Sequence, residues 1–150
     1  MSEHRADLSW RRRDHETEAG TYSRNHTVTL NGGQSVKVSA SVEYLGDAQC
    51  ADPEQLLISS LSSCHMLFFI AVAERRGFKV DSYKDSPVGY LEKTERGGMS
   101  VTRIELSPEV TFQGDREIDA ETLSKIHHSA HRNCFIANSL NAEVSIDGML

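Results

Sequence analysis

The sequence predicts a single α+β domain spanning residues 1–150. Two observations carry this prediction. Segments of alternating polarity, typical of half-buried strands, flank one long apolar segment, and the predicted elements follow the order ββ-α-ββ-αα-β. The composition, 38% hydrophobic and 25% charged, is that of an ordinary globular protein. We therefore expect antiparallel sheets around a central buried helix, with residues 1–20 as a less well-defined N-terminal segment.

The N-terminal part of the chain predicts a β-hairpin. Residues 21–30 and 35–45 alternate in polarity, and Asn31-Gly32-Gly33 between them supplies a turn with positive φ. The inward positions of the second strand are Val36, Val38, Ala40, Val42 and Tyr44. In the first strand, Arg24 and His26 share the inward phase. A buried guanidinium is costly without a partner, so Arg24 either meets an acid or a water-filled pocket, or turns outward at a frayed strand end.

A long helix is predicted to begin at Asp52 and to end near Arg76. Asp52 can act as the N-cap, Pro53 suits the first helical position, and Gln55 can close a capping box. Gly77 is a helix stop. An apolar stripe is formed by Leu57, Leu61, Cys64, Phe68 and Ala71. Because most other faces are also apolar, the helix is expected to be almost encircled by protein.

The remaining elements are shorter. Residues 83–94 and 100–112 read as two antiparallel strands joined by a glycine-rich turn. A second helix is expected from an Asp119 N-cap to about Arg132, followed by a short helix that opens at Asn133-Cys134. Residues 142–146 close the chain as a strand.

The charge balance disfavours nucleic acid and membrane partners. The net charge is −6, so no general basic field exists to hold phosphates or an anionic membrane. The run Arg11-Arg12-Arg13 is the only basic cluster, and such a run usually forms a solvated edge. The longest apolar run, residues 66–73, is too short to span a bilayer, and the N-terminus does not resemble a signal peptide. A cytoplasmic protein is expected.

Three cysteines, an odd number, do not suit a disulfide-stapled secreted domain. Cys134 is expected in the first turn of the short helix, where unpaired N–H groups favour the thiolate. Cys64 lies in the middle of a helix, where apolar burial favours the neutral thiol. A reactive Cys64 therefore needs a nearby cation, and Arg24 is the available candidate. Cys50 is a loop thiol to which no role is assigned.

The stretch "DPEQLLISSLSSC", followed seventy residues later by "NCFIANSL" and preceded by "YSRNHTV" on an early strand, resembles the OsmC/Ohr family of thiol peroxidases. The resemblance implies the OsmC-like fold, an intertwined homodimer with sites at the subunit interface, and reduction of organic hydroperoxides to alcohols. By matching position, Cys64 would be the peroxidatic thiol and Cys134 the resolving thiol. Arg24 and Glu54 would be the pair that activates Cys64.

Three departures place the chain nearer a less characterised branch of the family. Asp52 stands where Asn is usual, His65 follows the first cysteine where Phe is common, and Cys134 is followed by Phe-Ile-Ala rather than Pro-Val-Ser. The first change is harmless because Asp caps a helix as well as Asn does. The other two bear on substrate preference.

The chemistry explains this set of residues. A thiolate at Cys64 attacks the terminal oxygen of the peroxide and becomes a sulfenic acid, which Cys134 condenses to a disulfide. A guanidinium can stabilise both the thiolate and the developing negative charge, and a carboxylate can hold it in place. The predicted substrate pocket consists of His26, Leu61, His65 and Phe68, with an apolar character suited to alkyl or lipid hydroperoxides. Neither a metal nor another cofactor is expected. The resemblance suggests a dithiol reductant, possibly a lipoylated protein.

Two other functions stay open at this level. A zinc site could be assembled from Cys64, His65, His127, His131 and Cys134, because the last two histidines are one helical turn apart. A non-catalytic, small-molecule-binding protein would leave both cysteines inert.

A distance on the long helix points to a composite site. Glu54 and Cys64 are ten residues apart, about 15 Å along a straight helix, which is too far for both to contact one compact cluster directly. Either Arg24 bridges the gap or Glu54 comes from a partner subunit. The sequence therefore predicts an obligate dimer.

Overall fold

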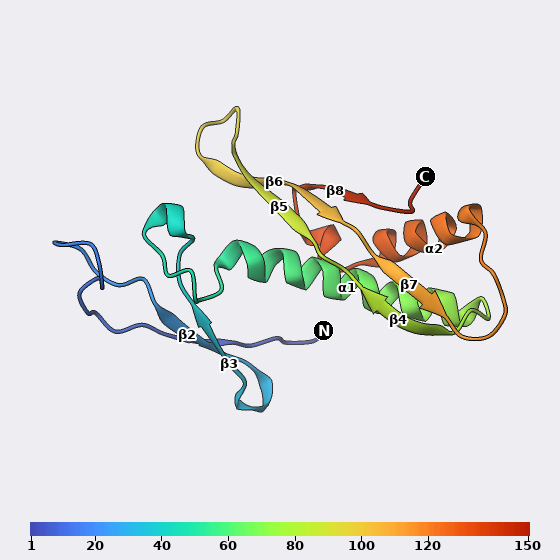
Figure 1. Cartoon of the computed structure of the whole chain (residues 1–150), viewed down its shortest axis with the longest axis horizontal. Coiled ribbons are helices and arrows are strands. Elements are labelled where there is room, and N and C mark those ends of the chain that lie inside the picture. The colour runs from blue at the N-terminus through green and yellow to red at the C-terminus, as the bar shows by residue number, and fades with distance from the viewer. The chain divides into compact units, whose positions relative to one another are not determined.

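The computed structural model describes all 150 residues, which form two compact units, residues 1–56 and residues 57–150 (Figure 1). The chain contains two α-helices and eight strands, and the strands form three separate sheets. The predicted α+β class is confirmed.

The first unit is built on a three-stranded antiparallel sheet of β1 (Asp7–Ser9), β2 (His26–Thr29) and β3 (Ser35–Val38), with β2 in the centre. The predicted hairpin is present, and its turn is a 3-10 helix, η1 (Asn31–Gly33). Gly32 and Gly33 adopt φ values of 70° and 71° there. β1 was not predicted, because three exposed residues are too few for an alternating pattern to be visible.

The second strand of the hairpin is shorter than predicted. It ends at Val38, and a 3-10 helix, η2 (Val42–Tyr44), replaces its expected second half. Gly46 lies so close to this turn that a Cβ there would overlap the carbonyl oxygen of Ala40. The chain therefore doubles back instead of continuing as a strand. The prediction that Val42 and Tyr44 face the core is wrong, since both are exposed.

Helix α1 (Pro53–Arg75) begins and ends as predicted. The Asp52 carboxylate accepts a hydrogen bond from the Gln55 N–H at 2.7 Å, and the Gln55 side-chain oxygen accepts one from the Asp52 N–H at 3.1 Å. At the other end Gly77 has φ 82°, and the Phe78 N–H donates to the Ala73 carbonyl at 3.0 Å. Both ends are stabilised by the local interactions that the sequence indicated.

Only one side of α1 is fully buried in the single chain. The buried residues are Leu61, His65, Phe69, Val72 and Ala73, so the predicted stripe through Cys64 and Ala71 was misplaced. On the opposite side, Leu67 is 61% exposed. The helix is also long and apolar enough to cross a membrane by length and composition, contrary to the prediction from the apolar run; the core helices of soluble proteins pass the same test.

The sequence predicts two strands between residues 83 and 112, but the structure has four, because a proline interrupts each predicted strand. Pro87 separates β4 (Val80–Lys84) from β5 (Val88–Lys93), and Pro108 separates β6 (Met99–Leu106) from β7 (Glu109–Phe112). Proline lacks the N–H that a continuous ladder requires. The result is two sheets in place of one.

These strands are completed by β8 (Glu143–Ile146). β4 pairs with β7 antiparallel, and the other sheet has the order β5-β6-β8 (Figure 1). β8 runs parallel to β6, so this sheet is mixed and departs from the antiparallel arrangement that we expected. The carboxylate of Asp85 accepts a hydrogen bond from the Ser107 N–H at 2.7 Å and so joins the two breaks.

Helix α2 (Ala120–Asn133) is capped by Asp119, which accepts a hydrogen bond from the Thr122 N–H at 2.8 Å, as predicted. Its other end differs from the prediction. Cys134 is the C-cap of α2 and does not open a new helix. A short 3-10 helix, η3 (Ala137–Ser139), follows it.

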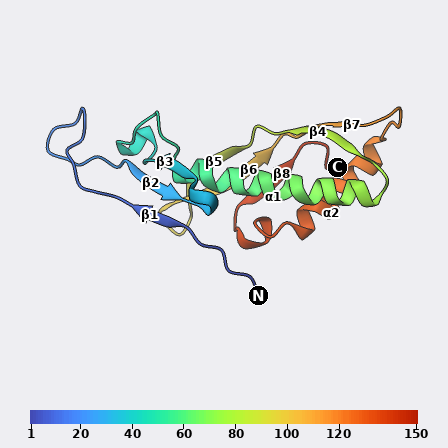
Figure 2. The same ribbon diagram turned by 90° about the horizontal axis from the view of Figure 1, so that it is seen from below.

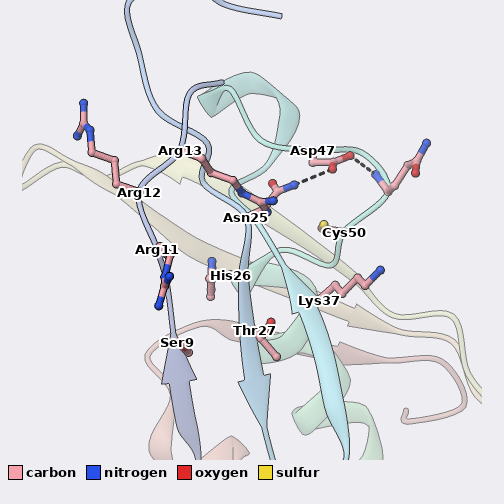
Figure 3. A pocket seen from close by; sticks show the side chains of 11 residues that line it. Ser9, Arg11, Arg12, Arg13, Asn25, His26, Thr27, Lys37, Asp47 and Cys50 are labelled. Atoms are coloured by element: carbon pink, nitrogen blue, oxygen red, sulfur yellow. Dashed lines mark hydrogen bonds between the residues drawn. The ribbon is translucent and has the colours of Figure 1, made fainter. Parts of the chain in front are cut away.

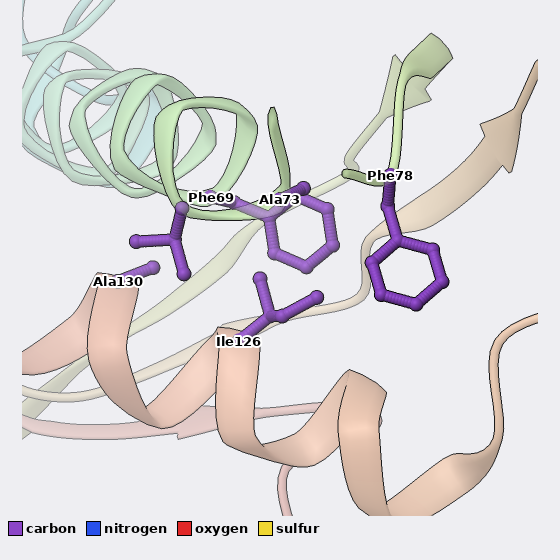
Figure 4. Packing of buried hydrophobic residues seen from close by; sticks show 6 residues of the cluster. Phe69, Ala73, Phe78, Ile126 and Ala130 are labelled. Atoms are coloured by element: carbon purple, nitrogen blue, oxygen red, sulfur yellow. The ribbon is translucent and has the colours of Figure 1, made fainter. Parts of the chain in front are cut away.

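Two hydrophobic clusters form the core of the second unit. In the first, α1 and α2 lie alongside each other (Figure 2), and Phe69 and Ala73 of α1 meet Ile126 and Ala130 of α2 near Phe78 (Figure 4). The second cluster contains Leu61, Ile104, Leu106, Cys134 and Ile146. This cluster fixes the position of Cys134 beneath α1.

Candidate thiol active site

Cys64 and Cys134 meet in the second unit although they are seventy residues apart in the sequence. Cys64 lies in the middle of α1 and packs against the buried cluster that contains Cys134. The two thiols are close enough for Cys64 to raise the pKa of Cys134. Neither is in a disulfide. The fold thus brings together the two thiols that the family resemblance singled out.

The two thiols differ in environment. Cys134 is completely buried, and Cys64 is partly exposed. Burial raises the pKa of Cys134 to about 11, although a hydrogen bond from the Ala137 N–H to its sulfur, at 3.4 Å, opposes the shift in part. The predicted thiolate-favouring setting of Cys134 is therefore wrong, because the residue ends a helix and lies in the core. At neutral pH Cys134 is a protonated thiol.

A cavity of about 480 Å³ opens beside Cys64. Its lining residues are Ser60, Ser63, Cys64, Leu67, Phe68, Ala71, Phe135 and Ile136. The rings of Phe68 and Phe135 meet edge to face, with their centroids 5.0 Å apart. Most of the lining is hydrocarbon, so the cavity suits an apolar substrate group next to the sulfur.

Of the predicted pocket residues in this unit, only Phe68 lines the cavity. Leu67 and Phe135 were missed, although local signals for both exist. Leu67 is three residues after Cys64 and therefore shares its side of the helix, and Phe135 directly follows Cys134.

Leu61 and His65 lie in the core instead of the cavity. His65 is fully buried, and its Nε2 is 3.0 Å from Nδ1 of His127, with the two rings almost parallel. Burial lowers the pKa of His65 to about 3 and that of His127 to about 4. Both imidazoles are neutral at pH 7, and His65 has a structural place in the fold.

The zinc alternative is not supported by the geometry. No group of three or more His, Cys, Asp or Glu side chains in the chain is arranged to hold a metal ion. Nδ1 of His65 and Nδ1 of His131 are buried without a hydrogen-bond partner, and His65 and His127 instead hydrogen bond to each other.

The other predicted site residues lie in the first unit. The Arg24 guanidinium donates to the Tyr22 carbonyl at 2.6 Å and lies over the Tyr22 ring, 4.6 Å from its centroid. His26 hydrogen bonds through Nδ1 to the Arg24 carbonyl at 2.8 Å. Glu54 is half-buried in the first turn of α1, and the single chain shows no ion pair between Arg24 and Glu54.

Comparison with known proteins identifies the family. The family described as OsmC-like protein matches residues 46–147, about two thirds of the chain. The chain belongs to this family. The resemblance to OsmC and Ohr proteins is thereby confirmed.

Relatives within the OsmC-like family span several bacteria. A solved OsmC-like protein of unknown function from Vibrio cholerae is 42% identical, with a TM-score of 0.90 over 98% of this chain and 99% of that chain. Peroxiredoxin OsmC of Escherichia coli is 28% identical over 66% of each chain. The organic hydroperoxide resistance protein OhrB of Bacillus subtilis, 19% identical, has the same fold, with a TM-score of 0.67 over 95% of this chain and 96% of its own.

Proposed function

We propose that this OsmC-like protein is a cysteine-based peroxidase that reduces organic hydroperoxides to alcohols. The observation that carries the proposal is the contact between a partly exposed Cys64, at the wall of an apolar cavity, and the buried Cys134. A thiol that peroxide can reach, backed by a second thiol that water cannot reach, is the arrangement that a two-cysteine peroxidase needs.

The environments of the two thiols support an order of reaction in which Cys64 attacks first. Cys64 as thiolate attacks the terminal oxygen of ROOH, the O–O bond breaks, and the alkoxide takes a proton to leave as ROH. The sulfur of Cys64 is now a sulfenic acid. Cys134 then attacks that sulfur, the S–O bond breaks, and the departing hydroxide takes the Cys134 proton to form water. The two electrons that reduce the peroxide come from the two thiols, which end as a disulfide.

The cavity supports an alkyl or lipid hydroperoxide as the substrate. Leu67, Phe68 and Phe135 present hydrocarbon next to Cys64, where the organic group of the peroxide would rest. Hydrogen peroxide has no such group and gains nothing from this surface. The names of two relatives, a peroxiredoxin and an organic hydroperoxide resistance protein, point in the same direction.

Activation of Cys64 is assigned to Arg24 and Glu54 within a homodimer. Arg24 lies half-buried over the Tyr22 ring, and its two terminal nitrogens donate to the Tyr22 carbonyl and, at 3.5 Å, to the Thr21 hydroxyl. In the dimer, the longer of these two bonds would give way to a carboxylate or a peroxide oxygen. An intertwined homodimer would supply the remaining contacts and cover the exposed side of α1. Turnover would use a dithiol reductant, possibly a lipoylated protein, in the cytoplasm.

The direct test is consumption of cumene hydroperoxide with dihydrolipoamide as reductant. We expect Cys64→Ser to abolish turnover, because a neutral hydroxyl is a poor nucleophile toward peroxide. Cys50→Ser is the matched control and should retain wild-type turnover. Equal activity of the wild-type and Cys64→Ser proteins, or no activity in either, would leave the non-catalytic binding protein as the better description.

A further inference from the structure

A second cavity, of about 500 Å³, lies in the first unit beside the N-terminal sheet (Figure 3). It is lined by Ser9, Arg11, Arg12, Arg13, Asn25, His26, Thr27, Lys37, Asp47, Gln49 and Cys50. These residues come from the end of β1 and the segment after it, from β2 and the residue before it, from β3, and from the loop that precedes α1. No residue of the thiol site in the second unit takes part.

The cavity is strongly positive in a chain whose net charge is −6. Arg11, Arg12, Arg13 and Lys37 contribute four positive charges and Asp47 contributes one negative charge, so three positive charges remain. The sequence alone predicts a solvated edge for this run of arginines. In the folded chain Lys37, twenty-four residues beyond Arg13, lines the same cavity as the arginines. The arginine run therefore forms one wall of a pocket.

None of the four cationic side chains forms an ion pair with an acid, although the charge of Lys37 acts on Asp47 and helps to lower its pKa. None of them donates a hydrogen bond or forms an ion pair within the chain; Arg12 lies 5.6 Å from the centroid of the Tyr22 ring. Arg13 extends toward Asn25 and Asp47, whereas Arg12 points away from them (Figure 3). Several uncompensated cations around one cavity repel each other unless an anion joins them.

Asp47 stabilises the loop that precedes α1 through hydrogen bonds to its carboxylate. Its carboxylate accepts hydrogen bonds from the Gln49 N–H and from Nδ2 of Asn25, each at 2.9 Å, and these bonds lower its pKa (Figure 3). The carboxylate therefore orders the loop next to Cys50. Two of its acceptor directions are used in this way, so Asp47 does not replace an external anion.

We infer that this pocket binds a small hydrophilic polyanion through phosphate or carboxylate groups. Guanidinium groups match the geometry of both anions through paired N–H donors, and Lys37 adds a compact charge. The volume exceeds what a single inorganic phosphate needs and falls in the range of small-molecule sites. Ser9, Thr27 and Gln49 add neutral hydrogen-bonding groups that suit a hydroxylated body.

The alkylation rate of the Cys50 thiol reports whether an anion occupies the cavity. Burial and the neighbouring Asp47 raise the pKa of this thiol, and Lys37 and Arg13 act in the opposite direction. An anion bound to Lys37 and Arg13 would screen them and would also cover the sulfur. Both effects slow alkylation of Cys50, and neither acts on the thiols of the other unit.

The test is calorimetric titration of the full chain with citrate and, separately, with inorganic phosphate, at constant ionic strength. We expect saturable binding of at least one anion and a loss of affinity of about tenfold or more in the double variant Arg13→Gln/Lys37→Gln. The double variant Lys93→Gln/Arg96→Gln removes the same charge from the end of β5 and the turn that follows it, and should bind as the wild type does. Binding of only one anion would identify the phosphate or the carboxylate as the recognised group.

The second measurement requires no variant. Alkylation of Cys50 by neutral iodoacetamide, followed on its own peptide by mass spectrometry, should slow by about tenfold in saturating anion, with no change at Cys64. Absence of binding, equal loss in both double variants, or unchanged alkylation of Cys50 would overturn the inference. Tighter binding of a single-stranded oligonucleotide than of either small anion would also overturn it. The result is independent of the proposed peroxidase chemistry.

Discussion

His65 and His127 form a buried imidazole pair, with Nε2 of the first 3.0 Å from Nδ1 of the second. The pair joins α1 to α2 across the core, and Phe69 packs against His127 with the ring centroids 4.6 Å apart. One ring donates the hydrogen bond and the other accepts it. A proton added to the accepting nitrogen would remove the bond and place a charge in the core.

This pair predicts an acid-sensitive fold. Burial lowers the pKa of His65 to about 3 and that of His127 to about 4, from an ordinary value of 6.5. The unfolded chain therefore binds protons at a higher pH than the folded chain does. The contribution of the neutral pair to the free energy of unfolding is fully present above pH 6.5. As the pH falls toward 4, this contribution decreases by about 1.4 kcal/mol per pH unit for each histidine.

The measurement is urea unfolding at pH 7 and at pH 5. The variant His127→Asn should be less stable at pH 7 because His65 loses its partner, and it should show a smaller pH dependence than the wild type. His4→Asn, on an exposed part of the N-terminal segment, is the matched control and should keep the wild-type dependence. An unchanged dependence in His127→Asn would assign the acid sensitivity to other groups.

Local signals predicted both ends of α1 and the start of α2. The caps at Asp52 and Asp119 depend on hydrogen bonds to residues three positions away, and the sequence within four residues contains all that is needed. The breaks at Pro87 and Pro108 were also readable, because a missing N–H ends a ladder wherever it falls. The alternating pattern, taken alone, predicts one continuous strand through each proline.

Long-range contacts explain the features that the sequence did not predict. Apolar residues cover almost all sides of α1, so the sequence pattern does not indicate which side is buried. The buried side is determined by the packing of α2 against α1. The setting of Cys134 depends on Ile104 and Ile146, which lie in distant strands. His65 and His127 are sixty-two positions apart, and the sequence around each of them does not indicate that the two side chains are buried together.

The roles of the two thiols predict different fates in peroxide. Cys134→Ser should consume about one equivalent of cumene hydroperoxide and then stall, because no second thiol condenses with the oxidised Cys64. Intact mass should show a gain of one oxygen atom that progresses to two. Cys64→Ser should show neither gain, since Cys134 is buried and protonated at neutral pH. Oxygen on the Cys64→Ser chain alone would reverse the roles.

The assignment of Arg24 predicts a loss of thiol reactivity. Arg24→Ala should slow alkylation of Cys64 at pH 7 by about tenfold or more, because the thiolate loses its nearest proposed cation. Arg24→Lys should rescue the rate only in part, since an ammonium cannot hold a carboxylate and a peroxide oxygen through one planar fork. Arg96→Ala, in the exposed β5–β6 turn, should have no effect. Identical rates in all four proteins would show that another group activates Cys64.

The open side of α1 predicts the assembly. Leu67 and Phe135 are 61% and 72% exposed in the single chain, and both line the cavity beside Cys64. A second copy that covers them would bury hydrocarbon and complete the cavity wall at the same time. We therefore expect a dimer by light scattering at micromolar concentration.

Leu67→Glu tests this assembly, because a carboxylate buried at the contact costs several kcal/mol if it lacks a partner. The variant should shift toward monomer and lose peroxidase activity together with assembly, even though both cysteines are intact. Leu150→Glu places the same charge on a side chain that is 84% exposed at the C-terminus, and it should stay dimeric and active. A wild-type protein that is monomeric and fully active, or a Leu67→Glu dimer with normal turnover, would remove α1 from the interface and would make the site complete within one chain.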